Sequence, residues 1–241
     1  GMGIPGWHTE CVVMINSLFG EKIDIHGGGV DLKFPHHENE IAQSMALNNN
    51  HLANYWMHNG HINVEGTKMS KSLGNFILAK DFIKDKDANT VKLAMFKTHY
   101  RLPFNITEEL IDEAKSLNEK IENAIKQAMI DISVNNLEID KNFKDSKIDE
   151  IMDEDFNTPN LISYLLELVK ELNTNLRQKK DYIEIINKIY TITKILGLKY
   201  NYDKLDEDSI NLYKEWLLKR SNKDFESADR IRQELISKGI L

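Results

Sequence analysis

Apolar residues recur at helical spacing through most of residues 105–241. The clearest series places leucines at positions 161, 165, 168, 172 and 176, which lie on one face of a helix. Thr158-Pro159 suits the start of that helix. The same periodicity predicts further helices over 107–128, 182–196, 210–218 and 225–236. The second part of the chain is therefore predicted to be an all-α bundle, with a polar connection over 135–149.

Residues 1–104 show a different pattern, in which short apolar alternations stand between helical stretches. Strands are predicted over 23–25 and 61–64, and helices over 10–18, 36–47 and 89–100. The glycine run at 27–29 directly follows the first strand and predicts a turn. The predicted fold class is therefore α/β followed by all-α, with the boundary between residues 104 and 105.

Composition limits the class of protein. The chain has 241 residues, 41% hydrophobic and 29% charged, with one cysteine. Such a chain can bury a core, has no internal disulfide framework and has no apolar run of the roughly 20 residues that a membrane helix needs. The net charge of −7 is unlike the basic footprint of a generic nucleic-acid-binding protein. Contacts with nucleic acid would therefore depend on local basic patches.

Side chains that can bind metals are concentrated in the first part. Cys11, His36 and Glu40 carry three different ligand types, and the last two are four residues apart. On a helix, residues at this spacing share a face, and thiolate, imidazole and carboxylate together suit Zn²⁺. Surface histidines on an acidic helix, beside one buried thiol, would show the same spacing. Spacing alone leaves both interpretations open.

Two further segments could bind anions. His26 is followed by three glycines, which let a backbone approach a nucleotide closely or simply form a strained turn. Lys68 and Lys71 stand three residues apart in a loop that contains serine and glycine. Such a loop suits a lid that brings cations onto phosphates, although a solvated basic loop would have the same composition.

Several motifs together resemble one enzyme family. Residues 68–72 read KMSKS, which resembles the second signature of class I aminoacyl-tRNA synthetases. Other stretches are similar to the cysteinyl-tRNA synthetases of that class. They are PGWHTEC (5–11), DIHGGGVDL (24–32), FPHHENEIAQS (34–44), YWMH (55–58), DFNTP (155–159) and FESADRIR (225–232). The resemblance extends over essentially the whole chain and is densest in residues 1–104.

The resemblance implies a specific domain organisation. Residues 1–104 would form the second half of a Rossmann-type catalytic domain with the KMSKS loop and a connecting region. Residues 105–241 would form a helical tRNA anticodon-binding domain. The family's first half carries a His-Ile-Gly-His signature and another zinc cysteine, and this sequence contains neither. We therefore expect the chain to be the C-terminal part of a longer enzyme and to be inactive alone.

The resemblance also implies the activity of a cysteine–tRNA ligase. Such an enzyme activates L-cysteine with ATP and Mg²⁺ and transfers it to tRNA(Cys). One Zn²⁺ per subunit would bind the substrate thiolate, held by Cys11, His36 and Glu40, with His37 as a neighbour rather than a ligand. Lys71 and Lys68 would be catalytic, and Trp7 and Asp31 would contact the cysteine. ATP would be contacted by His26, Gly27, Gly28, Gly29 and Lys71.

Two other functions remain open from the sequence. A cysteine ligase of thiol biosynthesis, which joins cysteine to an amino-sugar, would share these motifs, and a non-catalytic RNA-binding fragment of a synthetase would fit this chain. Basic candidates for RNA contact are residues 177–180 and the group Lys219, Arg220 and Lys223. The expected protein is cytoplasmic and monomeric, without a membrane partner.

Overall fold

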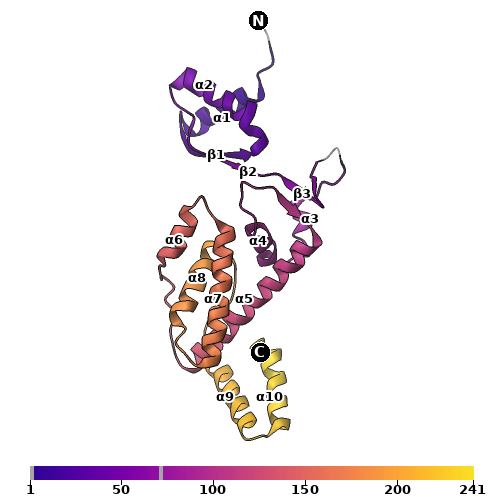
Figure 1. The fold of residues 1–241 in the computed structure, drawn as a ribbon, viewed down its shortest axis with the longest axis vertical. Coiled ribbons are helices and arrows are strands. Elements are labelled where there is room, and N and C mark those ends of the chain that lie inside the picture. The colour runs from indigo at the N-terminus through magenta and orange to yellow at the C-terminus, as the bar shows by residue number, and fades with distance from the viewer. Residues whose placement is uncertain (1–2, 71–72) are drawn as a thin grey trace. The chain divides into compact units, whose positions relative to one another are not determined.

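The computed structural model describes residues 3–70 and 73–241, and its fold is shown in Figure 1. The chain divides into two compact units. One contains Gly1–Phe82 and Thr98–Glu108, and the other contains Ile83–Lys97 and Glu109–Leu241. The predicted fold class is confirmed, because parallel strands with helices precede an all-helical region. The division into functional domains at 104/105 stays a prediction.

The first unit is organised around two parallel strands. These are β1 (Ile23–Gly29) and β2 (Ala53–Asn59), which pair from Ile23↔Ala53 to Gly29↔Asn59. Helix α1 (Trp7–Phe19) precedes β1 and packs against helix α2 (Glu38–Asn48), which lies in the crossover from β1 to β2. The buried residues Val12, Ile15 and Leu52 form the core, with Ile23 and Trp56 against it.

The crossover begins with two short irregular turns, η1 (Val30–Leu32) and η2 (Lys33–His37). The second turn is π-helical and ends where α2 begins. The predicted helix from Pro35 is therefore correct in place, although its first residues form a wider turn. This turn carries His36 and His37 into the interior, where both are buried.

A second sheet in the same unit has the strand order β4-β3-β5. Its strands are β3 (Ile62–Val64), β4 (Thr67–Lys68) and β5 (Phe104–Ile106), with β3 antiparallel to β4 and parallel to β5. Gly60 leads into β3, and a Cβ there would lie 2.2 Å from the carbonyl oxygen of Leu102. Only glycine allows this approach of the two backbones. Helix α3 (Ala79–Phe82) follows the KMSKS segment.

The second unit is a bundle of helices. They are α4 (Ala88–Phe96), α5 (Glu108–Val134), α6 (Ser146–Asp153), α7 (Thr158–Gln178), α8 (Ile183–Ile195), α9 (Glu207–Ser221) and α10 (Phe225–Ser237). Helix α7 starts within one residue of the prediction: Asn157 caps it in place of Thr158, and Pro159 lies in the first turn. The predicted polar connection over 135–149 is wrong at its end. Asp145 caps α6 there by accepting a hydrogen bond from the Lys147 amide.

The bundle core confirms the helical periodicity. Leu161, Leu165 and Leu172 on α7 are fully buried, as are Ile186 and Ile189 on α8, and these two helices pack side by side (Figure 1). Helices α9 and α10 form a hairpin (Figure 1), and its buried Leu235 packs in one cluster with Ile130 of α5. In the described residues, no helix is long and apolar enough to cross a membrane.

Helix α4 is tied to the bundle. The Asn89 side chain donates to the Lys199 carbonyl at 2.8 Å and accepts from the Lys199 amide at 2.9 Å. Lys92 Nζ donates to the Gly197 carbonyl. The helix that the sequence predicts in the first part of the chain therefore packs with residues more than one hundred positions later.

Candidate metal centre

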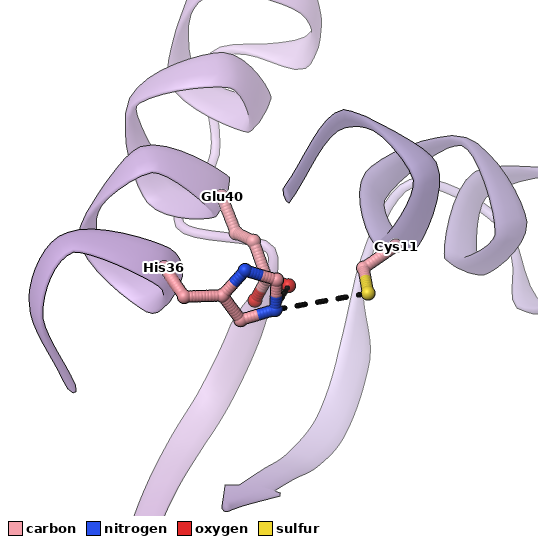
Figure 2. A group of neighbouring side chains, drawn as sticks. All are labelled: Cys11, His36 and Glu40. Carbon is pink, nitrogen blue, oxygen red and sulfur yellow. Dashed lines mark hydrogen bonds and ion pairs between the residues drawn. The ribbon is translucent and has the colours of Figure 1, made fainter. Parts of the chain in front are cut away.

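Three of the predicted site residues converge from two helices and the turn between them. Cys11 lies on α1, His36 on the π-helical turn η2, and Glu40 on the first turn of α2 (Figure 2). Cys11 Sγ lies 3.8 Å from His36 Nε2, and His36 Nε2 lies 2.9 Å from Glu40 Oε1. One ligand atom from each residue falls within 4.8 Å of the other two. The predicted spacing therefore produces a real cluster.

The Glu40 carboxylate is the centre of this cluster. It is 0% exposed, and its Oε2 accepts a hydrogen bond from His26 Nε2 at 2.8 Å. Its Oε1 approaches His36 Nε2 without hydrogen-bond geometry and has no hydrogen-bond partner in the described residues. A buried carboxylate oxygen without a hydrogen bond is costly unless it faces a cation.

The donor set fits a zinc ion. A thiol, an imidazole nitrogen and a carboxylate oxygen are the three ligand types that Zn²⁺ takes in proteins, and three protein ligands leave a position for a further ligand. Burial, followed by the charge of Glu40, raises the pKa of the Cys11 thiol. A bound dication would reverse this effect, because a coordinated thiol is deprotonated.

Aromatic rings surround the cluster. The Trp7 ring stacks on the His36 ring with centroids 4.0 Å apart, and Trp7 remains 59% exposed. The His26 ring meets Trp56 edge-on at 4.7 Å. Trp7 is therefore placed to form a wall of the metal centre, which agrees with its predicted contact to substrate. That contact stays a prediction.

A histidine pair lies beside the metal centre. His37 Nδ1 lies 2.8 Å from His58 Nε2, so one ring donates to the other. Burial lowers the pKa of both rings. His26, His37 and Glu40 also form a second group with metal-ligand spacing. The carboxylate is common to both groups, and the His37–His58 hydrogen bond already occupies one nitrogen of His37.

The glycine run at 27–29 lies inside β1, so the turn predicted there is wrong, and the run has a packing role instead. A Cβ on Gly28 would lie 2.8 Å from the His37 ring and 3.0 Å from Leu32. Gly28 therefore makes room for the buried histidine. His26 is expected to contact ATP, and in the structure its ring donates a hydrogen bond to Glu40. ATP contacts from His26 and from Gly27–Gly29 stay predictions.

Lys68, the first residue of the KMSKS motif, lies close to Asp31, which is predicted to contact the cysteine. Lys68 Nζ lies 3.6 Å from Asp31 Oδ2 and 3.4 Å from His61 Nε2. The side chains of Lys68 and Asp31 are each 54% exposed, so solvent weakens this ion pair. Lys71 lies outside the described residues. The catalytic roles of both lysines and the substrate contact of Asp31 stay predictions.

Comparisons with known proteins agree with this geometry. Residues 1–116 match the family model of the class I (C) tRNA synthetase catalytic domain, and residues 147–201 match the DALR domain. Residues 1–116 therefore form part of a class I (C) tRNA synthetase catalytic domain, which a DALR domain follows. The resemblance stated from the motifs is thereby confirmed, and the first match contains the whole Cys11, His36 and Glu40 cluster.

Curated relatives of this synthetase family are similar over the full chain. Cysteine--tRNA ligases of Oceanobacillus iheyensis and Acholeplasma laidlawii are 44% and 43% identical to it, over 100% of this chain and 55% of each relative. The chain therefore spans about half the length of the relatives. The Agrobacterium radiobacter K84 agnB2 LeuRS, solved in a ternary complex with tRNA and LeuAMS, matches with a TM-score of 0.57 at 17% identity, over 73% of this chain and 25% of that one. This match supports the fold.

Sequence reasoning missed the surroundings of the metal centre. The sequence shows His58 only within a family motif and predicts that His26 contacts ATP. In the structure His58 is hydrogen-bonded to His37, and His26 is hydrogen-bonded to Glu40. The parallel pairing of β1 and β2 explains both positions, because it sets His26 opposite Trp56 and Gly28 opposite His58. The sequence feature that indicates this arrangement is that β1 and β2 each carry one histidine.

Proposed function

We propose that this chain is part of a cysteine–tRNA ligase, which activates L-cysteine with ATP and transfers it to tRNA(Cys). The observation that carries the proposal is the convergence of Cys11, His36 and Glu40 within 4.8 Å, in a chain whose relatives are cysteine–tRNA ligases. The remaining part of such an enzyme would contribute the nucleotide signature that this chain lacks.

Selection of cysteine follows from the donor set. Zn²⁺ held by Cys11, His36 and Glu40 would supply a Lewis acid that binds a thiolate much more strongly than a hydroxyl. A site organised around one strong interaction can reject an analogue that lacks it without editing. Trp7, stacked on His36 at 4.0 Å, would cover the ligand ring and limit access of water to the bound amino acid.

The activation step needs positioning and positive charge. The cysteine carboxylate attacks the α-phosphate of ATP, and pyrophosphate leaves with the electrons of the broken P–O bond. Lys68 and Lys71 would stabilise the negative charge that develops on the phosphates, together with Mg²⁺. Lys68 lies 3.6 Å from Asp31. The ammonium group of cysteine could replace Lys68 as the partner of Asp31, and a phosphate of ATP could replace Asp31 as the partner of Lys68.

The acceptor distinguishes this function from its rival. A ligase that joins cysteine to an amino-sugar would share the metal centre. The DALR match over residues 147–201 and the cysteine–tRNA ligase relatives favour tRNA as the acceptor. The cytoplasm, where tRNA is charged, is the compartment we propose.

The test is amino-acid-dependent ATP–pyrophosphate exchange by the complete gene product, followed by charging of tRNA(Cys). Exchange should occur with cysteine and not with serine. Cys11→Ser should lower zinc content and cysteine-dependent exchange together, whereas Ser17→Ala, an exposed change on the same helix, should alter neither. Full exchange by a Cys11→Ser enzyme that retains its zinc would overturn the ligand assignment. Amide formation with an amino-sugar, without tRNA charging, would establish the rival function.

A further inference from the structure

Three histidines beside the candidate metal centre are not among its three proposed ligands. They are His26 on β1, His37 on the turn η2 and His58 on β2. The ring centroids of His26 and His37 lie 4.9 Å apart, and those of His37 and His58 lie 5.0 Å apart. Imidazole is a common ligand of divalent metal ions in proteins. This histidine group therefore has the chemistry of a metal site.

Glu40 links the histidine group to the metal centre through its two carboxylate oxygens. Oε1 lies 2.9 Å from His36 Nε2, and Oε2 lies 2.8 Å from His26 Nε2. Two ligands on one Zn²⁺ stand about 3.3 Å apart when their bonds are about 2.0 Å long. The His26–Glu40 pair is thus already spaced almost as two ligands of one ion. Because each oxygen faces a different imidazole, the carboxylate is placed to bridge two ions.

A third ligand atom completes the group. One ligand atom from each of His26, His37 and Glu40 lies within 4.8 Å of the other two. His37 and Glu40 are buried, and the His26 side chain is 19% exposed. Two imidazoles and a carboxylate are the protein ligands of some catalytic zinc sites, and they leave a position for water. The group is therefore a complete three-ligand set for Zn²⁺.

His58 supports this set whichever nitrogen of His37 binds the ion. His37 Nδ1 lies 2.8 Å from His58 Nε2. With the ion on His37 Nε2, Nδ1 carries the ring proton and donates it to His58, and such hydrogen bonds orient metal-bound histidines. With the ion on Nδ1, His58 Nε2 is close enough to become a fourth ligand. Both arrangements predict that loss of His58 weakens binding of the same ion.

The strand β1 leaves the edge of the His37 ring clear. A Cβ on Gly28 would lie 2.8 Å from His37 Cε1 and 3.1 Å from His37 Nε2. The register of the two strands also sets Gly28 opposite His58. Glycine at this position therefore keeps a side chain away from the ring nitrogen, so that the ring can turn toward an ion.

We propose that His26 and His37 hold a second Zn²⁺ ion, which shares the Glu40 carboxylate with the first. On binding, this ion replaces the hydrogen bond between His26 Nε2 and Glu40 Oε2, and the proton of the neutral His26 ring moves to Nδ1. The second ion binds more weakly than the first, because its ligands include no thiolate and because two dications on one carboxylate repel each other. It binds when zinc is in excess, and it breaks a hydrogen bond that orients a ligand of the first ion.

The experiment titrates Co²⁺ into the metal-free 241-residue chain and counts bound Zn²⁺ by equilibrium dialysis. We expect two ions per chain, with the second at least about tenfold weaker than the first. The first Co²⁺ should add a thiolate charge-transfer band, and the second should add only d–d absorption because its ligands are nitrogen and oxygen. Electron paramagnetic resonance intensity should fall as the second Co²⁺ binds, because ions that share a carboxylate are magnetically coupled.

Substitutions separate the two ions. His37→Phe keeps the buried ring and removes both nitrogens, so it should abolish the second step and keep the thiolate band. Cys11→Ser should do the reverse, binding one ion with nitrogen and oxygen ligands and without that band. His58→Phe should weaken the second ion about 10–100-fold, and it carries the test if circular dichroism shows that His37→Phe does not fold. The exposed His51→Phe is the matched control and should change neither step.

Binding of a single ion by the wild type would refute the proposal, because the two ligand groups would then be alternative positions of one ion. A second step that survives in His37→Phe and His58→Phe would place the second ion elsewhere on the chain and would refute it too. Undiminished paramagnetic resonance intensity would exclude the shared carboxylate. The measurements need neither ATP nor tRNA, so their failure would leave the proposed function to the exchange assay.

Discussion

Replacing His26 with phenylalanine should weaken metal binding although His26 is not one of the three proposed ligands. The His26 ring donates from Nε2 to Glu40 Oε2 at 2.8 Å, with side chains 19% and 0% exposed. This hydrogen bond fixes the carboxylate so that its other oxygen faces His36. Phenylalanine keeps the ring that packs against Trp56 and removes the donor.

Two independent magnitudes give a similar expected loss of zinc affinity. A hydrogen bond to a charged group contributes about 1.5–3 kcal/mol, and the buried position of Glu40 keeps water from replacing it. Loss of a residue that orients a metal ligand typically costs about 10–100-fold in affinity, which equals about 1.4–2.8 kcal/mol. We therefore expect the zinc dissociation constant of His26→Phe to rise about 10–100-fold.

The assay combines zinc competition against a chromophoric chelator with cobalt substitution. Co²⁺ bound to a thiolate shows a sulfur-to-metal charge-transfer band. This band should persist in His26→Phe at saturating Co²⁺, because all three ligands remain, and should disappear in Cys11→Ser. His26→Gln, which retains a donor, should recover part of the affinity, and the exposed His51→Phe should behave as wild type. Unchanged zinc affinity in His26→Phe would refute the reasoning, as would a thiolate band that survives in Cys11→Ser.

Three further changes test packing in the two units. Asn89→Ala removes both hydrogen bonds to Lys199 and should lower the free energy of unfolding by about 1–3 kcal/mol, measured by urea titration of the helical signal. Leu165→Ala, at a fully buried position, should cost about 2–5 kcal/mol in the same titration. Gly28→Ala places a Cβ 2.8 Å from the His37 ring and should weaken zinc binding in the competition assay. An unchanged urea midpoint in Asn89→Ala or Leu165→Ala would contradict the packing assigned to that residue. An unchanged zinc affinity in Gly28→Ala would contradict the close approach of Gly28 to the His37 ring.

The helical bundle could be predicted from the sequence because its core is periodic. The leucines of α7 stand at positions that a single buried face requires, and Pro159 marks its first turn, although Asn157 caps the helix in place of Thr158. The sequence did not predict helix α6, because only Ile148 of its eight residues is buried. A short helix with one buried residue does not produce a periodic signal that stands out from a polar connection.

The candidate metal centre could be predicted only in part. Spacing at i and i+4 brings His36 and Glu40 together, and this held even though His36 lies in a π-helical turn. The approach of Cys11 depends on the packing of α1 against α2. Its residue type makes it a candidate third ligand, and the family resemblance implies the same role, but no local pattern places it beside His36. The roles of His26 and His58 depend on the register of β1 and β2, which a local sequence pattern does not contain.

The buried carboxylate of Glu40 predicts an opposition between stability and metal binding. Burying a charge that is incompletely bonded is unfavourable, and replacing such a group by a neutral one is often neutral or stabilising. Glu40→Gln should therefore unfold at the same or higher urea concentration than the wild type when both are metal-free. The wild type should gain about 2.7 kcal/mol from zinc at one hundred times its dissociation constant, and the variant far less. If metal-free Glu40→Gln is instead less stable by more than about 2 kcal/mol, the carboxylate stabilises the fold through His26, and its burial would not be a requirement of the metal centre.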